Sequence, residues 1–143
     1  MAAQVVQFYK TLYQEIEEWR PFVEGLEFDE IGRLERDWLE RRFEKEEILL
    51  AVRELEGDKA LGLDGFFMAF FHYCWRVVER YVLAVFEEFY KHCKFEKSLN
   101  ATFIGLIPKK NDASNIRDFK PIRLVWSIYK ILAKVLTNHL KVV

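Results

Sequence analysis

Two short apolar runs in the C-terminal half constrain the fold most strongly. Thr102-Phe103-Ile104-Gly105-Leu106-Ile107 is rich in β-branched and apolar residues and is closed by Pro108, which predicts a strand of ordinary length. Turn-forming residues occupy 111–115, and a second extended run covers Phe119–Val125. We therefore expect an antiparallel hairpin with a long tip. Pro121 cannot donate a ladder hydrogen bond, so the second strand is expected to lie at an edge or to be irregular.

Helical spacing of apolar residues dominates the N-terminal third. One helix is expected over residues 5–16, ending before Pro21, because the residue ahead of a proline is biased away from helix. Residues 20–44 mix glycine, proline and many charges, which indicates a linker with one short helical piece around Trp38. We predict that residues 1–42 form an N-terminal helical extension and linker.

A cluster of acids predicts the start of the next helix. Carboxylates at 44–47 complement the positive end of a helix dipole, and Ile48 begins the inward stripe. Gly57 is expected to stop this helix in a positive-φ conformation. The loop 58–65 follows, with Asp64 expected to cap the helix after it.

Two aromatic or apolar helical segments complete the chain. Residues 66–92 carry aromatics at nearly every turn, which predicts one broken helix or two helices, with a break near 76–79 and the aromatics in the core. Ser127 is expected to be the N-cap of the last helix. The apolar stripe of that helix faces inward, and Lys130 and Lys134 occupy its other face.

The charge is distributed unevenly. The formal net charge is −1, but residues 109–143 carry eight basic and two acidic side chains, and residues 1–56 carry eight basic and fifteen acidic ones. A basic end on a neutral chain indicates a local binding face for a polyanion. The alternative is that these cations form an ordinary solvent-exposed face of a basic helix and bind no ligand.

The strongest candidate site is the predicted hairpin. Five cations fall on or beside strands that a turn folds together, so they are expected to converge on one side and to contact phosphates. Such contacts give affinity that depends on salt and is largely blind to sequence. The candidates are Lys109, Lys110, Arg117, Lys120 and Arg123. Lys130 and Lys134 form a secondary basic helix face.

Several classes of protein are disfavoured. Cys74 and Cys93 lack the C-x-x-C spacing of a zinc site, and no disulfide framework is indicated, so a reduced intracellular setting is expected. No apolar run is long enough to span a membrane, and the N-terminus lacks the pattern of a signal peptide. We expect no metal site, no membrane association, and a cytoplasmic or nuclear location.

Four elements in a fixed order carry a resemblance to a known family. They are Asp58–Phe66, Leu106-Ile107-Pro108-Lys109-Lys110, Phe119-Lys120-Pro121-Ile122-Arg123-Leu124 and Ser127–Leu136. This order resembles the start of the reverse transcriptase of plant LINE-type (non-LTR) retrotransposons. The resemblance implies that residues 43–143 are a partial reverse-transcriptase domain, the fingers of a right-hand polymerase. The fold class implied is mainly α with a small antiparallel β-hairpin (α+β).

The resemblance also implies roles for the hairpin. In the family the basic hairpin touches the triphosphate of the incoming nucleotide and the template; Lys109 takes the place of the strand-end lysine and Lys120 that of an arginine. Arginine and lysine are not interchangeable at a bidentate phosphate site. Trp126 stands where the family has glycine and is expected to clash in a tight corner. The full set of departures suggests a decayed, pseudogene-like transposon copy; they are Leu61, Leu63, Lys120, Arg123, Trp126 and His139.

The resemblance predicts no catalysis by this chain. Full-length relatives join nucleotides with two Mg²⁺ ions held by palm aspartates, and no such elements follow residue 140. The expected function is that of a truncated, non-catalytic fragment of an RNA-directed DNA polymerase, without catalytic residues or a cofactor of its own, that binds RNA or an RNA–DNA hybrid weakly. Self-association through surface that would pack on a missing palm is also expected.

A protein-interaction module is the alternative from another class. In this interpretation the acidic N-terminal half of a small helical domain docks a basic partner, and the hairpin is purely structural.

Overall fold

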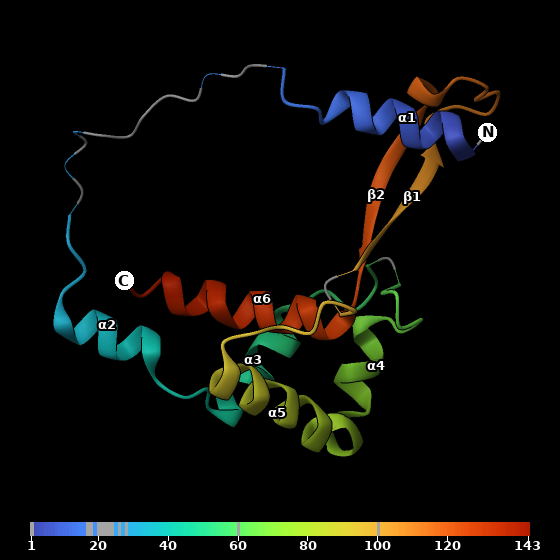
Figure 1. Cartoon of the computed structure of the whole chain (residues 1–143). Helices are drawn as coiled ribbons and strands as arrows, with labels where there is room; N and C mark the ends of the chain where they lie inside the picture. The colour runs from blue at the N-terminus through green and yellow to red at the C-terminus, as the bar shows by residue number, and fades with distance from the viewer. Residues whose placement is uncertain are drawn as a thin grey trace. The chain divides into compact units, whose positions relative to one another are not determined.

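The computed structural model describes residues 2–16, 19, 25, 27, 29–59, 61–99 and 101–143. The elements in chain order are α1 (Ala2–Leu12), α2 (Arg33–Glu40), α3 (Lys45–Glu54), α4 (Met68–Tyr73), α5 (Trp75–His92), β1 (Thr102–Pro108), the 3-10 turn η1 (Ile116–Asp118), β2 (Phe119–Val125) and α6 (Ser127–Leu140) (Figure 1). They form two compact units. A smaller unit contains Met1–Glu30 and Pro108–Lys120, and a helical unit contains Ile31–Ile107 and Pro121–Val143.

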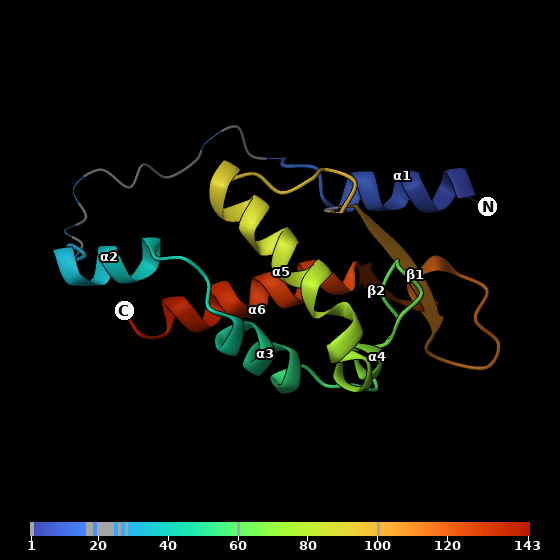
Figure 2. The same cartoon turned by 90° about the horizontal axis from the view of Figure 1, so that it is seen from below.

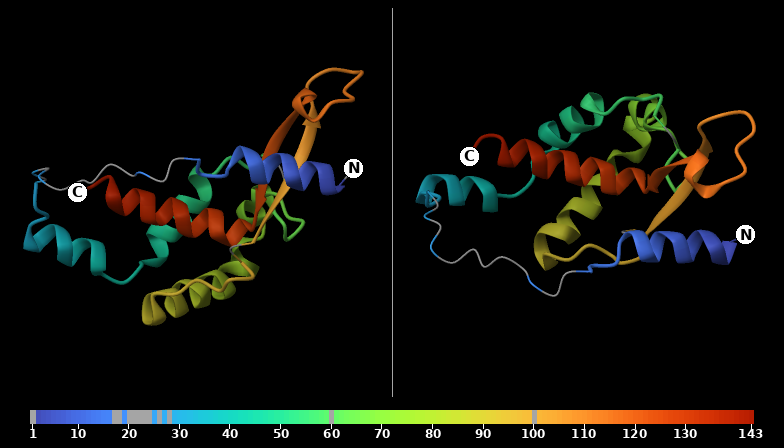
Figure 3. Two further views of the ribbon diagram at one scale, coloured as in Figure 1. Left: turned by 45° about the horizontal axis from the view of Figure 1, so that its top comes forward. Right: turned by 90° about the horizontal axis from the view of Figure 1, so that it is seen from above.

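The core of the helical unit is built by four helices. α3 contacts α6 and α4, α4 contacts α5, and α2 contacts α6. α3 lies beside α6 in Figure 2, and Figure 3 shows the same neighbours from two further sides. The expected mainly helical fold with one hairpin is confirmed. The buried apolar side chains are Ile48, Ala51, Val52, Met68, Phe71, Val82, Phe86, Ile131, Leu132 and Val135.

α3 begins as its acids predict but ends differently. Glu44 and Glu47 form a capping box around its first turn, and Ile48 is buried. At the other end the Leu55 amide bonds back into the helix, and Leu55 has a φ of −78°. The expected positive φ at Gly57 was wrong, because the last carbonyls already have a donor. The carbonyl of Gly57 instead accepts a hydrogen bond from the Ala69 amide of α4 at 3.2 Å.

The aromatic segment is two helices, with the break earlier than expected. α4 and α5 meet at Cys74, which has a φ of −99° and a ψ of 16°. Phe71 and Phe86 lie in the core as predicted. Tyr73 and Tyr81, in contrast, are largely exposed, so the segment is not apolar around its whole circumference.

The loop between α3 and α4 caps a helix that is distant in the sequence. The Asp64 carboxylate accepts hydrogen bonds from the Ser127 amide at 2.9 Å and from the Ser127 hydroxyl at 3.2 Å. It also accepts one from the Phe66 amide at 3.1 Å. Two expectations are thereby corrected: Asp64 caps α6 rather than α4, and Ser127 is the first helical residue rather than the N-cap. The N-cap position belongs to Trp126, whose side chain offers no acceptor, so the carboxylate must come from elsewhere.

Gly62 makes this long-range cap possible. A Cβ at this position would collide with the Asp64 carboxylate and would lie 2.8 Å from the Ser127 hydroxyl and 3.0 Å from the Val125 carbonyl oxygen. Trp126, by contrast, causes no clash in the corner between β2 and α6. Its φ of −58° and ψ of 140° suit any residue, so the expectation that this corner needs glycine was wrong.

The predicted hairpin is confirmed. β1 and β2 pair as a two-stranded sheet, and β2 runs into α6 (Figure 1). Gly105 of β1 lies close to Ile122 of β2, since a Cβ there would be 3.2 Å from an Ile122 side-chain carbon. Pro121 lies within β2, in a strand that has only one strand neighbour among the described residues.

The N-terminal helix is shorter than expected. α1 ends at Leu12, and residues 13–16 are not helical; Pro21 lies outside the described residues. The short helical piece around Trp38 is confirmed as α2, which contacts α6. The boundary after residue 42 stays a prediction.

A charged cluster joins the end of α2, the start of α3 and the end of α6. His139 is 4% exposed, and its Nε2 lies 2.8 Å from Glu47 Oε2. Glu47 also receives a hydrogen bond from Arg41 at 2.6 Å, and Arg41 stacks over the Trp38 ring. Burial opposes ionisation of Glu47, but the hydrogen bonds from Arg41, the Glu44 amide and His139 outweigh it, so the pKa of Glu47 is lowered.

We predict that Asp64→Ala destabilises the protein by about 2 kcal/mol, because it removes the cap of α6 and leaves the buried Ser127 hydroxyl short of a partner. Urea unfolding measures the change. Asp112→Ala, which alters an exposed aspartate of the hairpin loop, is the matched control and is expected to change little. Equal effects of the two substitutions would contradict the long-range cap.

We predict that Glu47→Gln costs about 2 kcal/mol near pH 7, because it weakens hydrogen bonds to a charged partner. The lowered pKa means that the unfolded state binds a proton first, near the ordinary value of 4.5. The stabilisation by Glu47 is therefore complete above about pH 4.5 and is lost as the pH falls through the folded-state pKa. The stability difference between wild type and variant should shrink in acid, as measured by urea unfolding from about pH 3 to 7. Glu46→Gln, on the exposed side of α3, should give no such trend.

Candidate nucleic-acid interface

The hairpin tip, residues Pro108–Lys120, is ordered by hydrogen bonds within the tip itself. The Lys109 amide donates to the Asp118 carbonyl at 2.8 Å. The Asn115 side chain accepts from the Arg117 amide at 3.1 Å, and the Asp118 carboxylate accepts from the Asn115 amide at 3.1 Å. Together these bonds cap the short η1 turn and fix the end of the tip.

Two of the candidate cations serve this local structure. Lys109 Nζ donates to the Arg117 carbonyl at 3.0 Å, and Lys110 Nζ lies 2.9 Å from Asp118 Oδ1. The hydrogen bond from Lys110 is the main cause that lowers the pKa of Asp118, followed by the bond from the Asn115 amide. A phosphate would have to compete with these partners for Lys109 and Lys110.

The side chains of the other hairpin candidates are exposed to solvent. Arg117 and Lys120 are exposed, and neither has a side-chain partner among the residues that the structure describes. Arg123 is also exposed and lies on β2 within the helical unit. The structure therefore brings Lys109, Lys110, Arg117 and Lys120 into one unit and places Arg123 in the other.

The secondary basic face on α6 is at least partly structural. Lys134 pairs with Glu54 of α3 at 3.0 Å, and the Asn138 amide donates to the same carboxylate at 3.1 Å. The hydrogen bond from Lys134 is the main cause that lowers the pKa of Glu54. Lys130 is half-buried and also has an interaction partner. These bonds attach α6 to α3 and leave Lys134 less available to a ligand.

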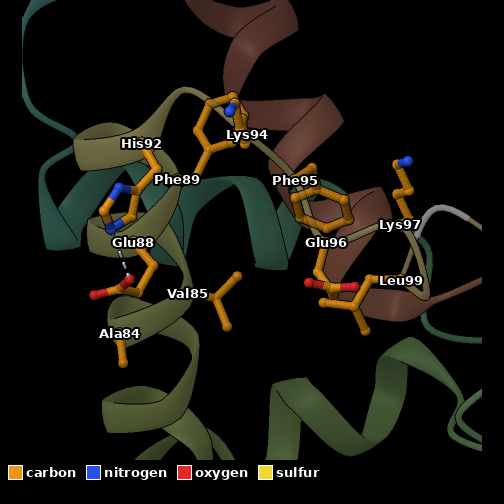
Figure 4. Close-up of a pocket in the computed structure, with 10 residues that line it drawn as sticks. All are labelled: Ala84, Val85, Glu88, Phe89, His92, Lys94, Phe95, Glu96, Lys97 and Leu99. Atoms are coloured by element: carbon orange, nitrogen blue, oxygen red, sulfur yellow. Dashed lines mark ion pairs between the residues drawn. The ribbon is translucent and has the colours of Figure 1, made fainter.

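A pocket that the sequence did not reveal lies along α5. It has a volume of about 740 Å³ and is lined on one side by α5 and on the other by the segment 94–99 (Figure 4). Phe89, Phe95 and Leu99 give it apolar walls, and His92 pairs with Glu88 at its rim at 3.3 Å. The helical spacing of the aromatics on α5 predicts that they lie in the core. The pocket arises from the way the segment 94–99 runs beside α5, and the sequence pattern does not show this path.

Three carboxylates of the described residues make structural hydrogen bonds at separate places in the fold. Asp64 caps α6, Asp118 orders the hairpin tip and Glu47 holds Arg41 and His139. Within the described ranges no group of three or more His, Cys, Asp or Glu side chains could hold a metal ion.

Among the residues that the structure describes, no helix has the length and apolar character needed to cross a membrane.

The two roles of lysine predict opposite effects of the same substitution. Lys134→Ala should lower stability by about 0.2–1 kcal/mol, as is typical of a partly exposed ion pair, and should change nucleic-acid affinity little. Lys120→Ala should leave stability unchanged and weaken nucleic-acid binding. Urea unfolding and fluorescence anisotropy, applied to both variants, check this reversal.

Comparison with known proteins gives an informative similarity. No protein-family model matches the chain. The chain is similar to the "Transposon TX1 uncharacterized 149 kDa protein" of Xenopus laevis, with 32% identity over 111 residues, or 78% of this chain. The chain spans 8% of the length of that relative. The sequence is thus similar to a short part of a large transposon-encoded protein.

Proposed function

We propose that this chain derives from a LINE-type retrotransposon and represents the fingers of its RNA-directed DNA polymerase, with the basic hairpin as a contact for nucleic-acid phosphates. The similarity to a transposon-encoded protein supports the origin. That relative comes from Xenopus laevis, so the proposal concerns the class of element and not its plant group. The ordered hairpin tip with exposed cations is the observation that carries the binding role.

The geometry of the tip supports contacts to phosphates that position a nucleic acid without reading its base sequence. Arg117 and Lys120 belong to a tip that Asp118 and Asn115 hold in one conformation. Because their own side chains have no partner among the described residues, a phosphate can bind them without first breaking a hydrogen bond or ion pair. Lysine acts on phosphate as a point charge, whereas arginine can bind in a bidentate way. Binding should therefore be weak, sensitive to salt and largely independent of sequence.

The proposal assigns no polymerase chemistry to this chain alone. The two-metal mechanism needs a clamp of carboxylates, and Asp64 and Asp118 are engaged at a helix end and a turn. RNA or an RNA–DNA hybrid is the proposed ligand, and the compartment proposed is the cytoplasm or the nucleus.

A helical protein-interaction module is the second candidate. The apolar pocket along α5 favours it, because Phe89, Phe95 and Leu99 offer walls of the kind that take a partner's side chains (Figure 4). In that case the cations of the hairpin would not affect binding of the partner.

Anisotropy titration of a labelled RNA–DNA primer-template across a salt series tests the proposal. Log affinity should fall linearly with log salt. The slope should become shallower in the Arg117→Ala/Lys120→Ala variant, by about 0.7–0.9 for each phosphate that the variant no longer neutralises. Lys109→Ala/Lys110→Ala should also weaken binding, but with a loss of stability, because these side chains hold the tip together.

Arg53→Ala/Arg76→Ala is the matched control, since both arginines are exposed on helices outside the hairpin. It lowers the net charge equally and should change the slope less than the tip variant does. Equal slopes for tip and control variants, or no binding in low salt by a folded protein, would contradict a phosphate-binding hairpin.

A further inference from the structure

The two-stranded sheet leaves one edge of each strand without a strand partner. β1 and β2 are neighbours, and the described residues contain no third strand in this sheet. An open edge presents a row of amide and carbonyl groups that can pair with another chain. Two strands are also few for an independently stable sheet, so pairing with further strands would stabilise it.

The two edges differ in how well they are protected. β2 carries Lys120, Pro121 and Arg123, and charges and proline are devices that discourage pairing at an edge. β1 carries no charge, and its one proline, Pro108, is the last residue of the strand. The edge of β1 is therefore the one suited to accept a strand.

Apolar side chains are exposed on both faces of β1. Phe103 is 67% exposed, Ile104 is 48% exposed and Ile107 is 47% exposed. Phe103, Gly105 and Ile107 share one face because side chains alternate along a strand, and Ile122 of β2 approaches Gly105 on this face. A strand added beside β1 would cover part of this apolar surface.

The sequence of β1 has approximate mirror symmetry about Gly105. In an antiparallel pair of two copies centred there, Phe103 lies opposite Ile107 of the second copy, and Ile104 lies opposite Leu106. Two-fold symmetry makes each pair occur twice, as an isologous interface requires. Aromatic side chains opposite β-branched ones are among the favourable cross-strand pairs.

We propose that β1 pairs with β1 of a second copy of this chain, in antiparallel register centred on Gly105, to form a four-stranded sheet across a two-fold axis. The absence of charge on this edge favours a second copy as the partner. The uncharged edge offers nothing to a polyanion or to a charged peptide, whereas two copies bring no like charges into opposition along residues 102–107. The contact is small, so the dimer should be weak and depend on protein concentration.

Sedimentation velocity of the full chain over a concentration series tests this pairing. The wild type should shift from monomer toward dimer as concentration rises. Phe103→Lys replaces two cross-strand pairs and adds like charges at the interface, so the dissociation constant should increase by about tenfold or more. Val77→Lys is the matched control, since Val77 is 66% exposed on α5, and it should leave the constant unchanged.

The register has its own test. With Cys74 and Cys93 changed to Ser, a mixture of Ile104→Cys and Leu106→Cys chains should form more disulfide-linked dimer than either variant alone. Circular dichroism verifies that each variant is folded. A wild type that stays monomeric, a Val77→Lys effect equal to that of Phe103→Lys, or cross-linking without preference for the 104–106 pair would each overturn the proposal.

Discussion

The hydrogen bonds of the Asp64 carboxylate with Ser127 connect the loop before α4, the end of β2 and the start of α6. A single side chain in the loop before α4 caps α6 and binds the hydroxyl of a fully buried serine. Since β2 ends at Val125, the same bonds fix the corner where the hairpin joins the helices. Gly62 supports them by leaving space for the carboxylate. The loop, the hairpin base and the last helix are therefore coupled, so a change at any of them affects the others.

The other end of α6 is held by polar side chains. His139 lies against Glu47 in a nearly dry site beside the rings of Trp38 and Phe43, and Arg41 completes the cluster. Lys134 adds an ion pair with Glu54 at a more exposed position. α6 is thus fixed by a cap at its start, by the Lys134 ion pair and the His139 hydrogen bond along its side, and by an apolar stripe in the core. This arrangement explains why part of the basic C-terminal region has a structural role.

Cationic and apolar surfaces occupy different elements. Arg117 and Lys120 are on the hairpin tip, whereas the exposed apolar residues Phe103, Ile104 and Ile107 are on β1 and the apolar pocket is on α5. The proposed nucleic-acid contact and the proposed pairing of β1 should therefore be separable by substitution. The approximate neutrality of the whole chain conceals this separation, because the charge is segregated along the sequence.

The sequence by itself determined the type and order of most elements. Apolar, extended runs predicted both strands, clustered acids predicted the start of α3, and helical spacing predicted the apolar stripe of α6, because these patterns reflect local geometry. Only the tertiary structure decided the roles of particular side chains. Asp64 caps a helix 63 residues away, His139 enters a charged cluster, and Lys109 and Lys110 are engaged while Arg117 and Lys120 are open. The roles of Asp64 and His139 depend on which distant groups meet in space, and those of the hairpin cations depend on how the tip folds back on itself; no local pattern encodes either.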